Sequence, residues 1–319
     1  MRNRTIALTF GGVAVMASAP LFLNAYWTDV LNSVGIYAIL ALSLNLIVGH
    51  AGLFNLGHAA FYAVGAYTAA ILNTTCRIPV LALLPVCGVA SGLFALVIAR
   101  PIIHLRGDYL CIVTIGVGEI VRIALVNNIF GITGGANGIF GVSRPSVFGY
   151  IIRIPEQFFY LIWLFAGITA LLFHLLEHSR VGRALNYLRE DEVAAEASGI
   201  DTAHYKLVAL VLGAAWAGMA GNIYAAKMTI ISPESFTFWE SVLMFAIVIL
   251  GGSGSIPGVL LGAFLIVGLP EFFRQFASAR MLIFGAAMVA MMIFRTQGLL
   301  PASPRKYRLR GVSSAGEAE

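Results

Sequence analysis

The segment SRVGRALNYLREDEVAAEASGIDTAHYK, residues 179–206, is a dense island of mixed charge in an otherwise apolar chain. Only 11% of the 319 residues are Asp, Glu, Lys or Arg, and the mean hydropathy is +0.89. Soluble domains carry about 25% charged residues. The long uncharged runs on both sides of the island predict an all-α, polytopic transmembrane helical bundle, because helices satisfy their own backbone hydrogen bonds in lipid.

Ten apolar segments around this island are candidates for membrane-spanning helices. Most offer close to the 20 or so apolar residues that a helix needs to cross the hydrocarbon. Glycines interrupt the third segment, and only the sequence GGSGSIPG separates the eighth from the ninth, so we expect eight to ten spans. The segments are residues 5–24, 31–48, 53–72, 79–99, 109–128, 158–176, 205–226, 238–252, 256–273 and 280–295.

The two ends of the chain differ from this apolar body. Arg2 and Arg4 precede an apolar run that ends in ASAP, a pattern that resembles a secretory signal peptide. The weakly polar stretch continues to about Trp27, which is long enough to span and favours an uncleaved first helix. We therefore expect one transmembrane domain over residues 1–300 and a disordered basic tail at residues 301–319 that faces lipid.

The distribution of basic residues predicts an orientation. Cytoplasmic loops of membrane proteins carry an excess of Lys and Arg. With ten spans and a cytoplasmic N-terminus, thirteen of the 20 basic residues fall inside, six fall outside, and Arg122 lies within a span. Both termini and the charged island are then cytoplasmic, and eight spans would also keep both termini there. The net charge of +5 reflects this orientation and does not indicate nucleic-acid binding.

The core of the island, REDEVAAEASG at residues 189–199, is predicted to be one short helix. Acidic residues crowd its start, where the helix dipole favours negative charge, and Gly199 stands at the position of a C-terminal cap. A helix this short is marginal alone and needs a partner surface. Its narrow face of small residues suits close approach by another protein, although a plain surface helix is the alternative. That face comprises Val193, Ala194 and Ala197.

The island and several other stretches resemble one transporter family. GRALNYLREDEVAAEASGID is similar to the cytoplasmic coupling segment of ABC importer permeases, specifically the branched-chain amino acid permeases of the LivM type. Four other stretches resemble the same family and occur in the family's order. They are LSLNLIVGHAGLFNLGHAAFYAVGAYTAA, LRGDYLCIVTIGVGEIVRI, TGGANGI and ILGGSGSIPGVLLGAF. Ala194, Ala195 and Gly199 fit the general motif Glu-Ala-Ala, three residues, Gly. Val193 stands where that motif has Glu, with Glu192 one residue earlier.

The resemblance implies an ABC importer permease fold and a set of partners. A homologous second permease would complete the pore, and a periplasmic binding protein would deliver branched-chain or related amino acids. Two cytoplasmic ABC ATPases with bound ATP-Mg would dock on the coupling segment, and the chain would lie in the bacterial inner membrane. The coupling residues implied are Gly182, Arg183, Asp191, Glu192, Ala194, Ala195 and Gly199.

The sequence itself lacks the means to hydrolyse ATP by a P-loop. That loop needs a Gly-Lys-Ser/Thr ending, and none of Lys206, Lys227 and Lys306 follows a glycine. Transport driven by ATP therefore requires the ATPase on another chain, and we expect no cofactor in this one. The three cysteines form no C-x-x-C pair, so neither a disulfide framework nor a zinc site is expected from them.

Polar residues within the predicted spans are candidates for the translocation path. Glu119 and Arg122 are three residues apart and can pair on one helix face. Such a pair either fixes helix packing or lines the path of a zwitterionic substrate. A second group lies among glycines that permit close packing or a broken helix, and either explanation holds for it. Its members are Asn45, Asn55 and His58, with His50 close by.

One pattern and two other classes of function compete with this interpretation. HLLEH places His174, Glu177 and His178 at the H-x-x-E-H spacing of some metalloproteases, but at the end of a span and without an evident third ligand, so no metal site is expected. An ion-coupled secondary transporter would use intramembrane carboxylates, of which Glu119 is the candidate. A permease of the same family for urea, amides or aromatic acids also remains open.

Overall fold

The computed structural model describes residues 20, 22–105, 107–147, 150–272, 285, 289, 295 and 298–301. The predicted spans 5–24 and 280–295 lie largely outside the described residues, and so does the predicted tail at residues 301–319. The other eight predicted spans fall on helices.

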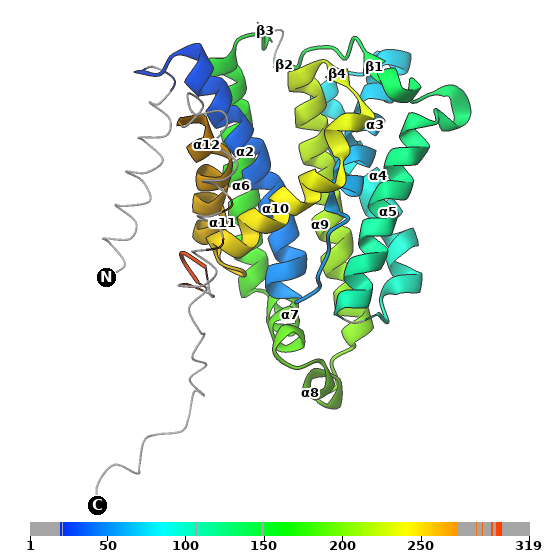
Figure 1. Ribbon diagram of the computed structural model, residues 1–319, viewed down its shortest axis with the longest axis vertical. Coiled ribbons are helices and arrows are strands. Elements are labelled where there is room, and N and C mark those ends of the chain that lie inside the picture. The colour runs from blue at the N-terminus through cyan, green and yellow to red at the C-terminus, as the bar shows by residue number, and fades with distance from the viewer. Residues whose placement is uncertain are drawn as a thin grey trace, which may run out of the picture.

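The described residues form a helical bundle with short strands at one end (Figure 1). The helices are α2 (Ala25–Asn45), α3 (His58–Cys76), α4 (Leu84–Ile102), α5 (Asp108–Val126), α6 (Pro155–His178), α7 (Arg180–Glu190), α8 (Glu192–Ala197), α9 (Thr202–Met228), α10 (Phe238–Gly251), α11 (Ile256–Ala263) and α12 (Leu269–Phe272). Two π-helical turns, η1 (Leu46–His50) and η6 (Phe264–Gly268), continue α2 and α11. Four 3-10 turns are η2 (Val80–Leu83), η3 (Ile129–Gly131), η4 (Gly135–Asn137) and η5 (Pro233–Phe236).

Six helical stretches of the described part are long and apolar enough to cross a membrane. They are Ala25–His50, Val80–Ile102, Asp108–Val126, Pro155–His178, Thr202–Met228 and Pro233–Gly251, and the apolar stretch Ile256–Glu271 is shorter. The third predicted span, residues 53–72, is helical only from His58. Residues 52–57 contain no helix, and Gly52 at the start of this stretch adopts φ +70°. The prediction of an all-α multi-pass membrane protein is confirmed.

Helix α9 lies at the centre of the bundle and packs against both α3 and α4. Small residues let these backbones come very close. A Cβ added at Gly65 would lie 2.2 Å from the Gly218 carbonyl oxygen, and one at Gly221 would lie 2.4 Å from the Tyr62 carbonyl oxygen. This seam therefore depends on glycine, as membrane helix contacts often do.

The two ends of the bundle differ in structure. Short antiparallel pairs form between β1 (Ile139–Phe140) and β4 (Ile230–Ile231), and between β2 (Ser146–Val147) and β3 (Tyr150–Ile151). They lie at one end, and α7 and α8 project from the other (Figure 1). The charged island is thus separated from the strands by the length of the bundle.

Candidate coupling site

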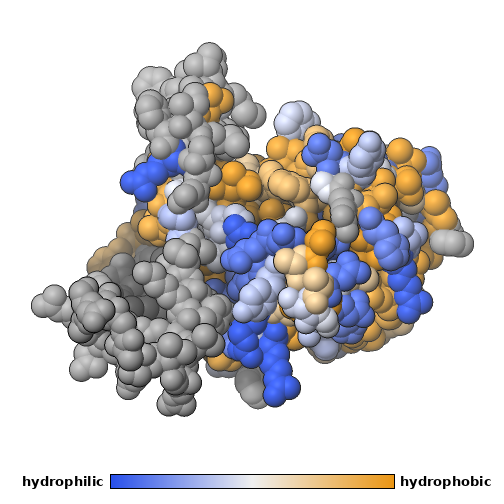
Figure 2. Space-filling model, turned by 90° about the horizontal axis from the view of Figure 1, so that it is seen from below, coloured by the Kyte–Doolittle hydropathy of each residue, from blue (hydrophilic) through white to orange (hydrophobic). Residues whose placement is uncertain are grey.

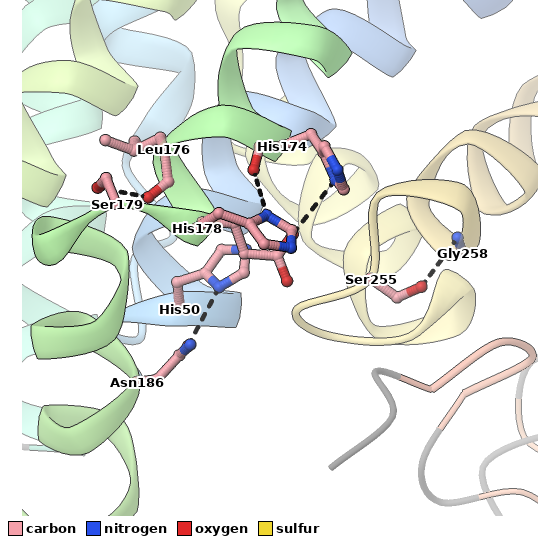
Figure 3. Close-up of polar contacts among 9 residues, drawn as sticks. His50, His174, Leu176, His178, Ser179, Asn186, Ser255 and Gly258 are labelled. Atoms are coloured by element: carbon pink, nitrogen blue, oxygen red, sulfur yellow. Dashed lines mark hydrogen bonds and ion pairs between the residues drawn. The ribbon is translucent and has the colours of Figure 1, made fainter. Parts of the chain in front are cut away.

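The turn from α6 into α7 is sharp and has little spare room. The Ser179 hydroxyl donates to the Leu176 carbonyl at 2.6 Å and accepts the Gly182 N–H at 3.2 Å, which caps α7 (Figure 3). A Cβ on Gly182 would lie 2.4 Å from the Leu176 carbonyl oxygen. Arg183 donates to the His178 carbonyl at 3.1 Å. The two predicted coupling residues Gly182 and Arg183 therefore fix where α7 leaves the membrane-spanning helix α6.

The prediction of a single helix over residues 189–199 is wrong, because the helix is interrupted at Asp191. Asp191 has extended backbone (φ −155°, ψ 112°), and its Oδ1 accepts the N–H groups of Val193 and Ala194 at 2.9 and 3.0 Å. It is the N-cap of a separate helix, α8, since its carboxylate satisfies donors that a continuous helix would bond internally. Gly199 follows α8 with φ +82°, which agrees with the predicted C-terminal cap.

Some of the small residues of α8 face solvent and one faces the protein interior. Val193 is 64% exposed, and Ala194 and Ala197 are also exposed, whereas Ala195 is only 3% exposed. The predicted narrow face is therefore open, and Ala195 instead packs inward. Seen from this end, hydrophilic residues gather on the surface amid hydrophobic flanks (Figure 2). An exposed small-residue helix on a polar surface suits contact with a soluble protein.

An ion pair between a buried lysine and a partly exposed glutamate joins α8 to the central helix. Lys206 Nζ on α9 lies 2.6 Å from Oε1 of Glu192, and Lys206 is 3% exposed. A cavity of about 380 Å³ lies beside the pair and is lined by the acidic residues Glu192, Glu196 and Asp201. Loss of Glu192 would leave the buried Lys206 ammonium without this carboxylate, so the contact favours α8 staying in place on α9.

A second connection joins α7 to the end of α2. Arg189 Nη1 donates to the carbonyl of Gly49 at 2.5 Å, and His50 Nδ1 lies 3.3 Å from Asn186 Oδ1 (Figure 3). Gly49 and His50 belong to η1, a π-helical turn. Such turns recur at functional sites and where helices bend.

The same turn is joined to the connection between α10 and α11. Asn45 Oδ1 accepts the Gly254 N–H at 2.8 Å, and both groups are buried. A Cβ on Gly49 would lie 2.1 Å from Asn45 Oδ1 and 2.5 Å from the Gly254 nitrogen. Asn45 is thus a joint between helices. At the start of α11 the Ser255 hydroxyl accepts the Gly258 N–H at 3.2 Å (Figure 3).

The predicted intramembrane polar group does not form one site. Asn55 Oδ1 accepts the Gly57 N–H at 2.9 Å, so this side chain closes a turn before α3. His58 Nε2 lies 2.8 Å from the Ser43 hydroxyl, which itself donates to the Leu40 carbonyl, so the imidazole donates there. Asn45, Asn55 and His58 each make a different contact, and whether any of them lines the translocation path stays a prediction. Two buried nitrogens, Asn55 Nδ2 and His58 Nδ1, have no hydrogen-bond partner.

The predicted pairing of Glu119 with Arg122 is present on α5. Arg122 Nε lies 2.9 Å from Glu119 Oε2, and its Nη1 lies 3.6 Å from Glu234 Oε1 on η5. The guanidinium therefore bridges two carboxylates and ties α5 to the turn before α10. This contact fits the packing explanation, and whether the pair also meets substrate stays a prediction.

His174, Glu177 and His178 come together as their spacing predicts. Their possible ligand atoms lie within 4.8 Å of one another, and His178 Nδ1 donates to the His174 carbonyl at 2.7 Å (Figure 3). His174 Nδ1 lies 4.0 Å from Glu177 Oε2. Within the described part of the chain this group stays at three members, which is the number of protein ligands in a catalytic zinc site, so the expected absence of a metal stays a prediction.

Sequence reasoning missed a carboxylate in the span that contains α10. Tyr37 donates to Glu240 Oε2 at 2.7 Å, a contact between α2 and α10. The signal was present, since Glu240 falls inside the predicted span 238–252. An acidic residue three places into an apolar helix was passed over in favour of Glu119.

Comparisons with known proteins agree with this architecture. A family model described as "Branched-chain amino acid transport system / permease component" matches residues 26–294. The high-affinity branched-chain amino acid transport system permease protein LivM of Salmonella typhimurium is 39% identical, over 96% of this chain and 77% of its own length. LivM of Escherichia coli is 40% identical, over 93% and 75%. LivH of Escherichia coli is 26% identical, over 74% and 80%. No solved structure matches significantly.

Proposed function

The chain belongs to the family of branched-chain amino acid transport permeases, and from that membership we propose how it is oriented, driven and partnered. It is a multi-pass membrane protein and a permease component of an ABC transport system, hence a transport subunit rather than an enzyme. The proposal is that it lies in the bacterial inner membrane with both termini cytoplasmic. There it imports a branched-chain or related amino acid.

The proposed partners divide the work of transport. A second permease of the same family completes the pore, and a periplasmic binding protein delivers the substrate. Two cytoplasmic ABC ATPases hold ATP-Mg and dock on α7 and α8. The absence of a P-loop in this sequence supports the last assignment, because the chain has no such means of using ATP itself.

The exposed face of α8 is the observation that carries the proposal. Val193, Ala194 and Ala197 face solvent, yet the helix is held firmly from behind by Ala195 and by the Glu192–Lys206 pair. A helix fixed to the bundle and open on its small-residue side can transmit a push from a docked protein. Two contacts, Arg189 with the Gly49 carbonyl and Asn45 with the Gly254 N–H, connect α7 and the spans and can carry that movement between them.

A copurification experiment tests this assignment. The permease pair is expressed with its two ATPases, and the ATPase recovered per permease is compared among wild type, Ala194→Arg and Tyr150→Arg. Tyr150 is 84% exposed at the opposite end, so its variant adds the same charge away from α8. Ala194→Arg should lose most of the bound ATPase and Tyr150→Arg should keep it. Equal recovery from all three would remove α8 as the docking site.

A further inference from the structure

Glu240 is a carboxylate inside a membrane-spanning segment that forms no ion pair with the Lys and Arg residues the structure describes. It lies on α10 within the apolar stretch Pro233–Gly251, and it takes part in none of the ion pairs among the described residues. A charged side chain at membrane depth is costly, and such residues usually mark a substrate or ion path. The three other carboxylates of the outer end that form ion pairs, Asp29, Glu119 and Glu234, each meet a Lys or Arg.

One tyrosine bonds this carboxylate, and two further tyrosines lie in the same part of the bundle. The Tyr37 hydroxyl donates to Glu240 Oε2 at 2.7 Å. Tyr62 and Tyr224 pack against Phe236, which lies four residues before Glu240 in the chain. The three tyrosines come from three different helices, α2, α3 and α9, so the tertiary fold assembles this group.

A phenylalanine packs against two of these tyrosines. Phe236 on η5 meets Tyr62 edge to face, with ring centroids 4.9 Å apart and planes at 71°. Tyr62 and Tyr224 are 5.4 Å apart, and Tyr224 and Phe236 are 6.1 Å apart. We call these residues the Glu240 cluster: Tyr37, Tyr62, Tyr224, Phe236 and Glu240.

A carboxylate beside several aromatic rings has the chemistry that recognises an ammonium group. Ring faces attract a cation within about 6 Å, and more strongly where water is excluded. An ammonium group carries three donors and a positive charge, whereas the Tyr37 hydroxyl offers one neutral donor. An incoming ammonium can therefore take over the carboxylate that Tyr37 holds in the absence of ligand, and it restores the charge balance that the cluster lacks.

The position of the cluster suits this role. Tyr224 lies near the end of α9 that leads into β4, and Glu240 and Phe236 lie on either side of the start of α10. These segments are at the strand end of the bundle, away from α7 and α8 (Figure 1). In the proposed orientation this is the side from which an imported substrate arrives.

We propose that the Glu240 cluster binds the α-ammonium group of the amino acid during its passage through the membrane. This assignment rests on the proposed function for the class of substrate. It gives the chain a specificity element for amines, carried by Glu240, that is independent of the binding protein and of the coupling segment.

The test uses the complete transporter in proteoliposomes and two fragments of leucine as inhibitors of ATP-driven leucine uptake. One is 3-methylbutylammonium, which keeps the ammonium, and the other is 4-methylpentanoate, which keeps only the carboxylate. For wild type the amine should raise the apparent KM by about tenfold at a concentration where the acid has no effect. Leucine affinity of the isolated binding protein is measured with each fragment, so that inhibition at that protein is subtracted.

Variants then locate the effect. Glu240→Gln should abolish inhibition by the amine and slow uptake, and Glu240→Asp should retain part of both. Glu156→Gln, which alters a carboxylate in the first turn of α6 at the same end of the bundle, should behave as wild type. Equal inhibition of wild type and Glu240→Gln by the amine would overturn the cluster assignment, while absence of ATP-driven leucine uptake by wild type would instead sink the proposed function.

A further variant tests the proposal even if Glu240→Gln does not fold. Tyr37→Phe keeps the carboxylate and removes its internal donor, so the amine should inhibit it more strongly than it inhibits wild type. A purely structural Tyr37–Glu240 bond predicts lower thermal stability with unchanged inhibition, and that result would also overturn the proposal.

Discussion

At the scale of single residues, α8 shows how neighbouring alanines acquire different tasks. Ala194 and Ala195 both match the family motif, so the sequence assigns them the same role. The N-cap at Asp191 sets the rotation of α8, and this rotation turns Ala194 to solvent and Ala195 into the protein. The proposed docking role of α8 and its packing on the bundle can therefore be tested by separate mutations.

Arginine at the two alanines should have opposite consequences for folding. Ala195→Arg places a large charged side chain at a site that is 3% exposed, which costs several kcal/mol and should markedly reduce the folded protein. Ala194→Arg projects into solvent and should leave the melting temperature within about 2 °C of wild type. Thermal unfolding monitored by size-exclusion chromatography in detergent measures both. Comparable losses in the two variants would contradict the observed rotation of α8.

Residue types alone predicted some of these features and missed others. Gly199 as a C-cap and the Glu119–Arg122 pair followed from spacing, which local helix geometry fixes. The break at Asp191 did not, because an acidic residue near a helix start also fits an unbroken helix. The partners of Asn45 and His58 come from Gly254 and Ser43. Such tertiary contacts carry no local signal.

At the scale of elements, η1 lies between the charged island and the spans. Arg189 holds its Gly49 carbonyl from α7, and Asn45 at its other side holds Gly254. The turn is π-helical, so its backbone hydrogen bonds join residues five apart instead of the four apart in the α-helix before it. We expect motion of α7 to reach α10 and α11 through this turn.

Removing the Arg189 contact should uncouple ATP use from transport. Arg189→Ala deletes the donor to Gly49, so substrate transported per ATP hydrolysed should fall several-fold while ATPase binding persists, since one charged hydrogen bond is worth about 1.5–3 kcal/mol. Arg180→Ala is the matched control, because Arg180 is exposed on the same helix. Uptake and phosphate release from one proteoliposome sample give the ratio. An unchanged ratio in Arg189→Ala would exclude this route.

The α3–α9 seam should not tolerate even a methyl group. Gly65→Ala places its Cβ 2.2 Å from a backbone oxygen of Gly218, which cannot move alone, so we expect a loss of about 1–3 kcal/mol or more. Gly116→Ala on α5 meets nothing within 4 Å and should be neutral or slightly stabilising. Thermal unfolding of both variants checks the difference. Equal melting temperatures would mean that the helices lie further apart than described.

Element positions were largely predictable, and their boundaries less so. Runs of apolar residues located eight of the helices because hydrocarbon thickness sets their length. The start of α3 was displaced from residue 53 to His58, since Gly52 and the residues after it form a non-helical stretch that apolar composition does not reveal. Glu240 was overlooked because a single acidic residue hardly alters the hydropathy of its span.

At the scale of the whole molecule, the two ends should face different compartments. The predicted orientation puts α7 and α8 in the cytoplasm and the strands outside. The chain carries its own probe of this arrangement, since Cys76 is exposed at the end of α3 while Cys87 is buried. Thiol accessibility in intact cells therefore reports topology without a reporter fusion.

A membrane-impermeant maleimide should label Cys76 in intact spheroplasts. In a Cys76→Ser background, Glu196→Cys on the exposed surface of α8 should react only after the membrane is permeabilised. The unmodified Cys76→Ser protein measures background labelling of Cys111. If Glu196→Cys were labelled in intact spheroplasts while Cys76 of the wild-type protein was not, the protein would have the opposite orientation.

The central claim is that this chain transports an amino acid only when separate ATPases act on it through α7 and α8. The most direct measurement is leucine uptake into proteoliposomes that contain the chain and its second permease, with or without the ATPases, ATP and the binding protein. Uptake should require all of these components and be insensitive to ion gradients. Sustained uptake by the permeases alone, driven by a sodium or proton gradient, would contradict the account.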